Sequence, residues 1–322
     1  MTYAAHHLLT LAAALVAMAV MPRSRLAWRA PRTSLLIWQT VGLTLVLSAV
    51  GTAIAIGLAP YQLGIVPALV AFARDLAGGR LPAALTPLHL LCTAGGLAAT
   101  AWIAVAFARS ARSVAALRRR QRTLLNLIAR PHPDLREALV VEHPAVAAYC
   151  LPGRRAAIVV STGSLDLLTG QELRAVLAHE RAHARERHDL VILPFAALHR
   201  ALPSSRRVRA MLDAVALLVE MRADDRAARD NGRRPLATAL RRFRSCERLA
   251  TPPGTLGGTG GTGGTGGTDA RGGTDGRGGH DLDARIDRLS APPHSPWPVR
   301  ALLLLVALTV VSTPVSLFLL PL

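Results

Sequence analysis

Four long apolar runs constrain the fold of this chain more than any other feature. They cover residues 4–21, 34–59, 87–107 and 301–320. About 20 consecutive apolar residues let a helix cross the hydrocarbon core of a bilayer. Because every backbone polar group must be hydrogen-bonded in lipid, each run is expected to form a transmembrane helix. The pattern predicts a mainly α, multi-pass membrane protein.

The arginines that flank the runs predict their orientation. Arg23, Arg25, Arg29 and Arg32 follow the first run and no basic residue precedes it, which reverses the charge order of a secretory signal peptide. Six more arginines follow the third run within residues 109–122. The positive-inside rule places these segments in the cytoplasm. We expect a plasma (inner) membrane protein whose N-terminus lies outside and whose long segment between the third and fourth runs is cytoplasmic.

Composition divides the chain into four parts. Residues 1–109 hold three spans with short loops, and residues 110–250 form a cytoplasmic domain. Residues 251–283 are a flexible linker with repeated Gly-Gly-Thr, which cannot bury a core. Residues 284–322 are a juxtamembrane segment and the fourth span. Short segments within residues 138–161 predict strands, so the cytoplasmic domain is expected to be α+β.

The basic composition indicates a membrane partner rather than a nucleic acid. The net charge is +18, and all 38 basic residues are Arg. Many of them lie beside the apolar runs, where anionic headgroups attract them. A nucleic-acid groove would combine basic and aromatic residues, and aromatic residues are scarce in residues 110–250. We therefore expect contact with the lipid bilayer and no direct binding of nucleic acid.

Residues 179–183 read His-Glu-Arg-Ala-His in an apolar, alanine-rich segment. Positions four apart share one face of a helix, so His179 and His183 can bind one zinc ion. Glu180 is then placed to take a proton from the water that the metal activates. Thr169 and Glu172 form a capping box that predicts a helix over residues 170–187. The alternative is two exposed histidines on a charged helix.

The segment after this motif offers two polar residues near the site. Asp189 lies six residues beyond His183, where the metzincin pattern has its third ligand. Glu186 stands where that pattern needs Gly to turn the chain, which disfavours Asp189 as a ligand. His188 is a candidate to line the site.

A second segment supplies the missing carboxylate. Glu220 follows an apolar run and begins the pattern E-x-x-x-D, and a carboxylate is what a His-His-Glu zinc site lacks. Asp224 lies one helical turn further and can accept a hydrogen bond from a ligand imidazole. The alternative is a solvated acidic stretch.

The strand expected at residues 156–161 precedes the motif helix. Two roles are open for it. It can be an edge strand that pairs with the backbone of an extended peptide, or an ordinary core strand. Three cysteines, Cys92, Cys150 and Cys246, lack the paired spacing of a disulfide framework or a zinc ribbon.

Taken together, the chain resembles the BlaR/MecR-type membrane zinc metallopeptidases (metallopeptidase family 56), in a short form without an outer sensor domain. The position of the domain between the third and fourth spans fits this resemblance. The matching residues are 178–183, 188–189 and 220–224, with further similarity at 158–165 and 285–289. The resemblance covers most of the chain and is strongest over residues 149–229.

This resemblance implies a zincin-like (gluzincin) peptidase domain. One Zn²⁺ per chain is expected on His179, His183 and Glu220, with Glu180 as the catalytic base and Asp224 supporting a ligand imidazole. The implied substrate is a cytoplasmic protein, such as a winged-helix transcriptional repressor, cleaved in a signal-transduction pathway. β-Lactam sensing is not implied, because the sequence shows no outer penicillin-binding domain.

Two alternatives to regulated proteolysis remain. An HtpX-like quality-control peptidase shares both motifs but places its spans differently. A non-enzymatic membrane signalling scaffold with a relict site is the other alternative, and the intact set of ligands and base argues against it. The sequence leaves the oligomeric state open.

Overall fold

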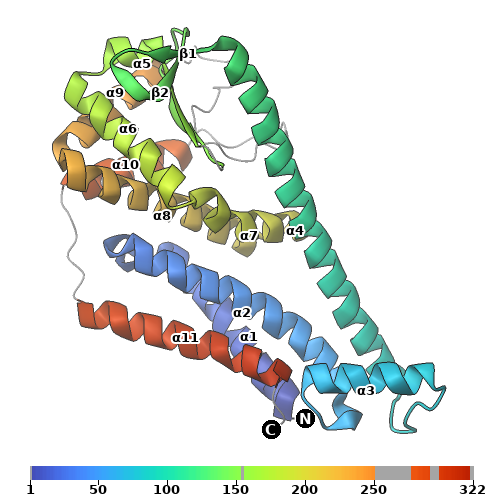
Figure 1. The fold of residues 1–322 in the computed structure, drawn as a ribbon. Coiled ribbons are helices and arrows are strands. Elements are labelled where there is room, and N and C mark those ends of the chain that lie inside the picture. Colours follow the sequence, from blue (N-terminus) through green and yellow to red (C-terminus); the bar gives the residue numbers. More distant parts are fainter. Residues whose placement is uncertain (1, 154–155, 251–276, 291–296, 320–322) are drawn as a thin grey trace. The chain divides into compact units, whose positions relative to one another are not determined.

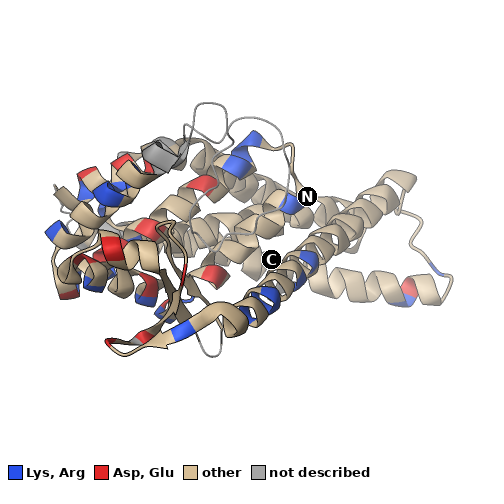
Figure 2. Ribbon diagram, turned by 90° about the horizontal axis from the view of Figure 1, so that it is seen from above, with Lys and Arg blue, Asp and Glu red and all other residues tan. Residues whose placement is uncertain are grey.

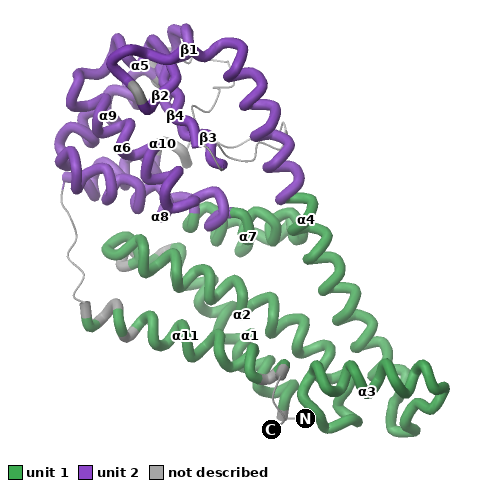
Figure 3. Tube along the Cα trace, viewed as in Figure 1, with its two compact units in different colours: residues 1–110, 193–215, 295–322 green, residues 111–192, 216–294 purple. Residues whose placement is uncertain are grey.

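The computed structural model describes residues 2–153, 156–250, 277–290 and 297–319. Most of the structure is helical (Figure 1). The chain divides into two units, and each unit combines segments that are far apart in the sequence (Figure 3). Unit 1 contains residues 1–110, 193–215 and 295–322, and unit 2 contains residues 111–192 and 216–294.

Unit 1 contains the apolar helices. Among the described residues, three helices are long and apolar enough to cross a bilayer, as the first three runs predict: α1 (Thr2–Val20), α2 (Pro31–Gly57) and α4 (Pro87–Ile128), of which the part up to residue 110 belongs to unit 1. The fourth run lies in α11 (Trp297–Leu319), whose apolar stretch among the described residues is the shorter Leu303–Ser316. The connecting elements are η1 (Met21–Arg23), η2 (Arg25–Arg29), η3 (Ala59–Tyr61) and α3 (Ile65–Ala77).

Small and polar residues join α1, α2 and α11 inside unit 1. The hydroxyl oxygens of Thr10 and Ser48 lie 2.8 Å apart, between α1 and α2. The buried ring of His7 lies against Gly51, which has no side chain to displace it, and packs edge-on against Phe318 at 5.5 Å between ring centroids. Small residues let apolar helices approach closely, and their association in lipid depends on such packing.

Helix α4 is longer than the sequence suggested. The sequence predicted a span over residues 87–107, but one helix of 42 residues continues beyond it to Ile128. No Gly or Pro interrupts residues 97–128, so nothing ends the helix after the apolar part. At 1.5 Å per residue the helix is about 63 Å long, roughly twice the thickness of the hydrocarbon core. All its charged residues are arginines, and they lie in its second half (Figure 2).

Unit 2 is built around a four-stranded sheet with the order β1-β2-β4-β3. Strand β2 runs parallel to β4, whereas β1 and β3 pair antiparallel with their neighbours. The sequence did not predict β1. Strand β4 is an inner strand, so the core role is correct for the segment before the motif helix, and the two edge strands are β1 and β3. The bounds are β1 (Ala129–His132), β2 (Leu135–Val141), β3 (Ala148–Leu151) and β4 (Ala157–Ser161).

Side chains of β4 alternate between two layers of core, as the two-residue repeat of a strand requires. Val159 packs with Leu125 of α4 and Leu151 of β3. Ile158 and Val160 face the other core, which contains residues of α6 (Gly170–Arg185) and α9 (Arg233–Ala250). The sheet therefore supports the motif helix from one face. Ser161 caps the short helix α5 (Thr162–Leu167).

Helix α6 begins at the predicted capping box and ends two residues before the predicted end. The Thr169 hydroxyl accepts from the Glu172 N–H at 3.4 Å, and the Glu172 carboxylate accepts from the Thr169 N–H at 2.8 Å. At the other end Arg187 has a φ of 50°, a left-handed conformation that breaks the helix. Helix α7 (His188–Ala201) starts directly afterwards.

Three further helices complete the description. Pro194 lies inside α7, which continues past it to Ala201, and the following Phe195 and Leu198 are buried. Helix α8 (Arg206–Asn231) contains the whole E-x-x-x-D motif, residues 220–224. Helix α10 (Arg277–Ser290) packs Ile286 and Leu289 into a core with α6 and α9, and it includes residues 277–283 of the expected linker.

The capping box makes a stability prediction. Thr169→Ala removes the side-chain acceptor at the start of α6 and should destabilise unit 2 by about 1 kcal/mol. For a domain of this size that lowers the midpoint of thermal unfolding by about 2–4 °C in detergent. Thr169→Ser keeps the acceptor and should unfold near the wild-type midpoint. Equal midpoints for the Ala variant and the wild type would contradict the role of the cap.

Candidate metal centre

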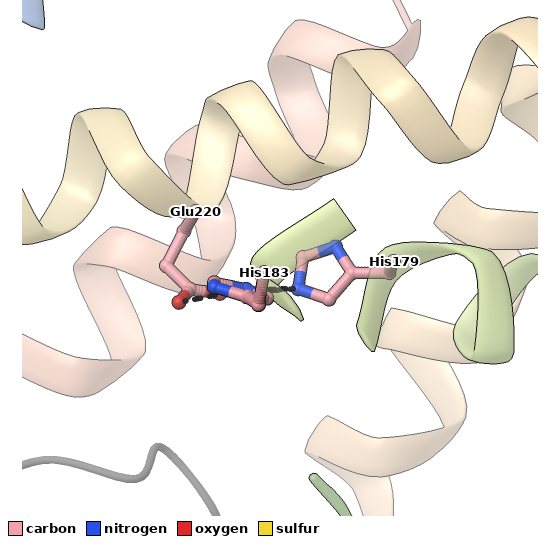
Figure 4. Close-up of side chains that lie close together, drawn as sticks. All are labelled: His179, His183 and Glu220. Carbon is pink, nitrogen blue, oxygen red and sulfur yellow. Dashed lines mark hydrogen bonds and ion pairs between the residues drawn. The ribbon is translucent and has the colours of Figure 1, made fainter. Parts of the chain in front are cut away.

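Two helices of unit 2 bring His179, His183 and Glu220 together (Figure 4). His179 and His183 lie one turn apart on α6, so both rings leave the same face of that helix. Glu220 comes from α8. The two Nε2 atoms are 3.1 Å apart, and they lie 3.3 Å and 3.4 Å from the Glu220 carboxylate oxygens. The three predicted ligands therefore meet.

These distances fit a tetrahedral metal ion. Zinc binds His nitrogen and carboxylate oxygen at about 2.0–2.2 Å, which places neighbouring ligand atoms about 3.4 Å apart. The three observed separations are close to that value, and both rings direct Nε2 inward. Within the part of the chain that the structure describes, this is the one such group of His, Cys and acidic side chains. The residues present therefore fit a divalent metal ion.

Asp224 lies behind His179, as the sequence suggested. Its Oδ1 atom is 2.9 Å from Nδ1 of His179, and the side chain is 1% exposed. A carboxylate in this position holds the ring with Nε2 directed at the metal. Asp224 is not a member of the metal group. It contacts the side of the His179 ring that faces away from the metal position.

Arg285 is the residue of this site to which sequence reasoning gave no role. It comes from α10, and it donates to Asp224 through Nε and Nη2, both at 2.8 Å. Its Nη1 atom lies 3.0 Å from Oε2 of Glu220. Two carboxylates on one helix face, one buried and one partly buried, need a compensating cation, and that need was the available signal in the sequence.

The charge of Arg285 keeps both carboxylates ionised. Burial alone would raise the pKa of Asp224, but the charge of Arg285 and the hydrogen bonds from Arg285 and His179 lower it to about 2. The pKa of Glu220 is likewise lowered, because Arg285 and the two histidines outweigh the effect of burial. Both side chains are thus available as anions at neutral pH.

Glu180 has the opposite electrostatic environment. Burial raises the pKa of its carboxyl to about 7, with a further contribution from the nearby charge of Glu220. The Glu180 carboxylate also accepts a hydrogen bond from the backbone of Cys150 on the edge strand β3. A carboxyl group whose pKa is close to neutrality can both accept and return a proton.

The two polar residues that follow α6, His188 and Asp189, have different surroundings. His188 is buried, and its Nδ1 atom lies 3.0 Å from Nδ1 of His183, on the side of the ring away from Glu220. Asp189 is held by Arg118 at 2.7 Å and does not join the metal group. The expectation that Asp189 is not a ligand agrees with this arrangement.

The three cysteines are free thiols, and none belongs to the metal group. Cys150 is buried beneath the site, and burial, with the charges of Glu180 and Asp189, raises the pKa of its thiol to about 12. A thiol that stays protonated at neutral pH is neither a nucleophile nor a metal ligand.

Comparison with protein families decides the class of this domain. The model of Peptidase family M48 matches residues 111–227, a segment that includes all of α6 and most of α8. Residues 111–227 are an M48 metallopeptidase domain. The M48 match does not confirm the more specific resemblance to family 56. Comparisons with curated proteins and with solved structures find no significant match.

The match also separates two kinds of site residue. His179, Glu180, His183, Glu220 and Asp224 all lie inside the M48 segment, whereas Arg285 lies beyond it. The domain therefore supplies the motif residues, and the later helix α10 supplies their positive partner.

The geometry predicts that metal content depends on Glu220. Glu220→Ala removes one of three ligands, and we expect the metal measured by plasma mass spectrometry to fall from about one ion per chain to a small fraction. Glu137→Ala is the matched control, because Glu137 also contacts α6, through Arg181, but is exposed. Equal metal content in the two variants would contradict the assignment of Glu220.

Proposed function

We propose that this protein is a membrane-anchored zinc endopeptidase that cleaves a cytoplasmic protein. The observation that carries the proposal is the convergence of two imidazoles and a carboxylate next to Glu180, in a domain of a metallopeptidase family. A relict scaffold would not need to retain three ligands, a base and the partners that orient them. The choice of zinc rests on the His-His-Glu donor set and the separations of its atoms.

The chemistry follows from the positions of the side chains. A zinc ion bound there would polarise the scissile carbonyl and make the attacking water more acidic. Glu180 accepts the water proton and returns it to the amine that leaves when the peptide bond breaks. Its pKa, raised to about 7 by burial, suits both directions of transfer. For a metal to bind, each imidazole must present the lone pair of Nε2, and Asp224 keeps the His179 ring oriented for this.

Strand β3 is the surface we propose for the substrate backbone. It forms one edge of the sheet, and the backbone of its residue Cys150 hydrogen-bonds to Glu180, so this edge borders the base. An extended peptide can add to such an edge through main-chain hydrogen bonds. Pairing there would hold the scissile bond beside Glu180. Because it uses main-chain hydrogen bonds, this binding would depend little on the amino-acid sequence of the substrate.

The membrane arrangement is part of the proposal. We infer four spans, an N-terminus outside and a cytoplasmic peptidase domain. The apolar helices support membrane association, and the arginines in the second half of α4 support the cytoplasmic side for its C-terminal end.

A test is to label single cysteines, introduced on a cysteine-free background at residue 2 and at residue 137, with a membrane-impermeant maleimide in intact cells. Labelling at residue 137 but not at residue 2 would reverse the orientation.

Two substrate classes remain for the same chemistry. Resemblance of the motifs to BlaR/MecR proteins supports regulated cleavage of a winged-helix repressor. The family match is to M48, which supports a metallopeptidase without that substrate and leaves membrane-protein quality control as the second candidate. Incubating the reconstituted enzyme with a repressor encoded nearby and with a misfolded membrane protein separates the two, because only the true class should be cut.

The base assignment makes a sharp prediction. Glu180→Gln keeps the size of the side chain but cannot accept a proton, so cleavage of an accepted substrate should fall by about 10²-fold or more. Metal content should stay at the wild-type level, because Glu180 is not among the three ligands. Cleavage at the native rate by this variant would exclude Glu180 as the base.

Removal and replacement of the metal test the choice of zinc. Dialysis against 1,10-phenanthroline should abolish cleavage, and one equivalent of Zn²⁺ should restore it. Mg²⁺ or Ca²⁺ should fail, because both prefer oxygen ligands and larger coordination numbers than this site offers. Restoration by Mg²⁺ alone would contradict the zinc assignment.

A further inference from the structure

The ring of His183 is supported from behind by a second histidine rather than by a carboxylate. Its Nδ1 atom lies 3.0 Å from Nδ1 of His188, whose side chain is 3% exposed. The Nε2 atom of His188 in turn lies 3.4 Å from Oε2 of Glu186. The three side chains thus form a line that leads away from the metal centre.

Glu186 is fixed at the end of this line by two arginines of α8. Arg222 donates to both carboxylate oxygens, from Nε at 2.8 Å and from Nη2 at 2.7 Å. Arg226 adds a contact from Nε at 2.9 Å. Burial would raise the pKa of Glu186, but Arg222 and the neighbouring His188 outweigh it and lower that pKa. Glu186 is therefore a fixed anion that can only accept hydrogen bonds.

The hydrogen-bond direction along the line has one consistent solution. If His183 presents the lone pair of Nε2 to a metal, its proton is on Nδ1. Nδ1 of His188 must then accept a hydrogen bond from the Nδ1–H group of His183. The proton of His188 is therefore on its Nε2. That proton points to the carboxylate of Glu186. With the His188 proton on Nδ1 instead, two N–H groups would face each other across 3.0 Å.

We propose that His188 and Glu186 are positioning residues that hold His183 in the tautomer and orientation required for metal binding. The inference rests on the proposed metal site and adds to it a partner for the second ligand. His179 is supported directly by Asp224, whereas His183 is supported through a neutral imidazole that relays the effect of Glu186. Residues behind metal-binding histidines commonly change metal affinity by about 10–100-fold when they are replaced.

The test compares two substitutions of His188 in the full-length protein in detergent. His188→Phe keeps a planar ring but removes the acceptor that faces His183. His188→Asn keeps an oxygen acceptor near the position of Nδ1. The affinity for Co²⁺ is measured by competition with a chelator, together with the visible absorption bands of the bound ion. We expect the Phe variant to bind about 10–100-fold more weakly, with shifted bands, and the Asn variant to recover most of the affinity.

His199→Phe is the matched control, because it makes the same change on the same helix, α7, at a residue outside the metal group. It should bind Co²⁺ as the wild type does. If His188→Phe does not fold, Glu186→Gln tests the far end of the line and should also weaken binding and shift the bands. Wild-type affinity and bands in whichever of these two variants folds would overturn the inference.

The result also distinguishes this inference from the proposed function. A wild-type protein that binds neither Co²⁺ nor Zn²⁺ would overturn the metallopeptidase proposal, and the positioning roles with it. A wild-type protein that binds metal, together with a folded His188→Phe variant of unchanged affinity, would overturn the positioning roles alone.

Discussion

The paired charges between Arg285 and two carboxylates are the interaction on which the candidate metal centre depends. Asp224 is buried and Glu220 is partly buried on the same helix, where unpaired anions would be costly. Arg285 contacts both, and it arrives on α10, 61 residues after Asp224 in the chain. Without it the carboxylates would gain stability by protonation, and a protonated Glu220 is a poor metal ligand.

Two layers of support surround the ligands. The sheet and α9 hold the apolar face of α6, so the polar face with both histidines is directed toward α8. Side-chain contacts reach both rings from outside: Asp224 lies against Nδ1 of His179, and His188 lies against Nδ1 of His183. Because the backbone and the ring orientations are fixed before any ion arrives, little conformational entropy has to be lost on binding.

Local signals in the sequence predicted much of this site, whereas two features of the fold were missed, each for its own reason. The capping box and the spacing of His179 and His183 depend on residues within four positions, and α6 forms as these signals indicate. The continuity of α4 was missed because the change from apolar to basic composition resembles a boundary, although no helix-breaking residue is present. The edge position of β3 was not readable, because strand order depends on which strands pair and not on their composition.

The sequence by itself determined the apolar helices, the motif helix and the type of chemistry, because each depends on side chains a few residues apart on one element. The sequence also pointed to Glu220 as the carboxylate ligand, whereas tertiary structure alone decided which arginine neutralises it and that Asp189 is held by Arg118. Those choices depend on contacts between residues as many as 71 positions apart. Electrostatic energy falls with distance in space, and only the packing of α4, α6, α7, α8 and α10 sets those distances.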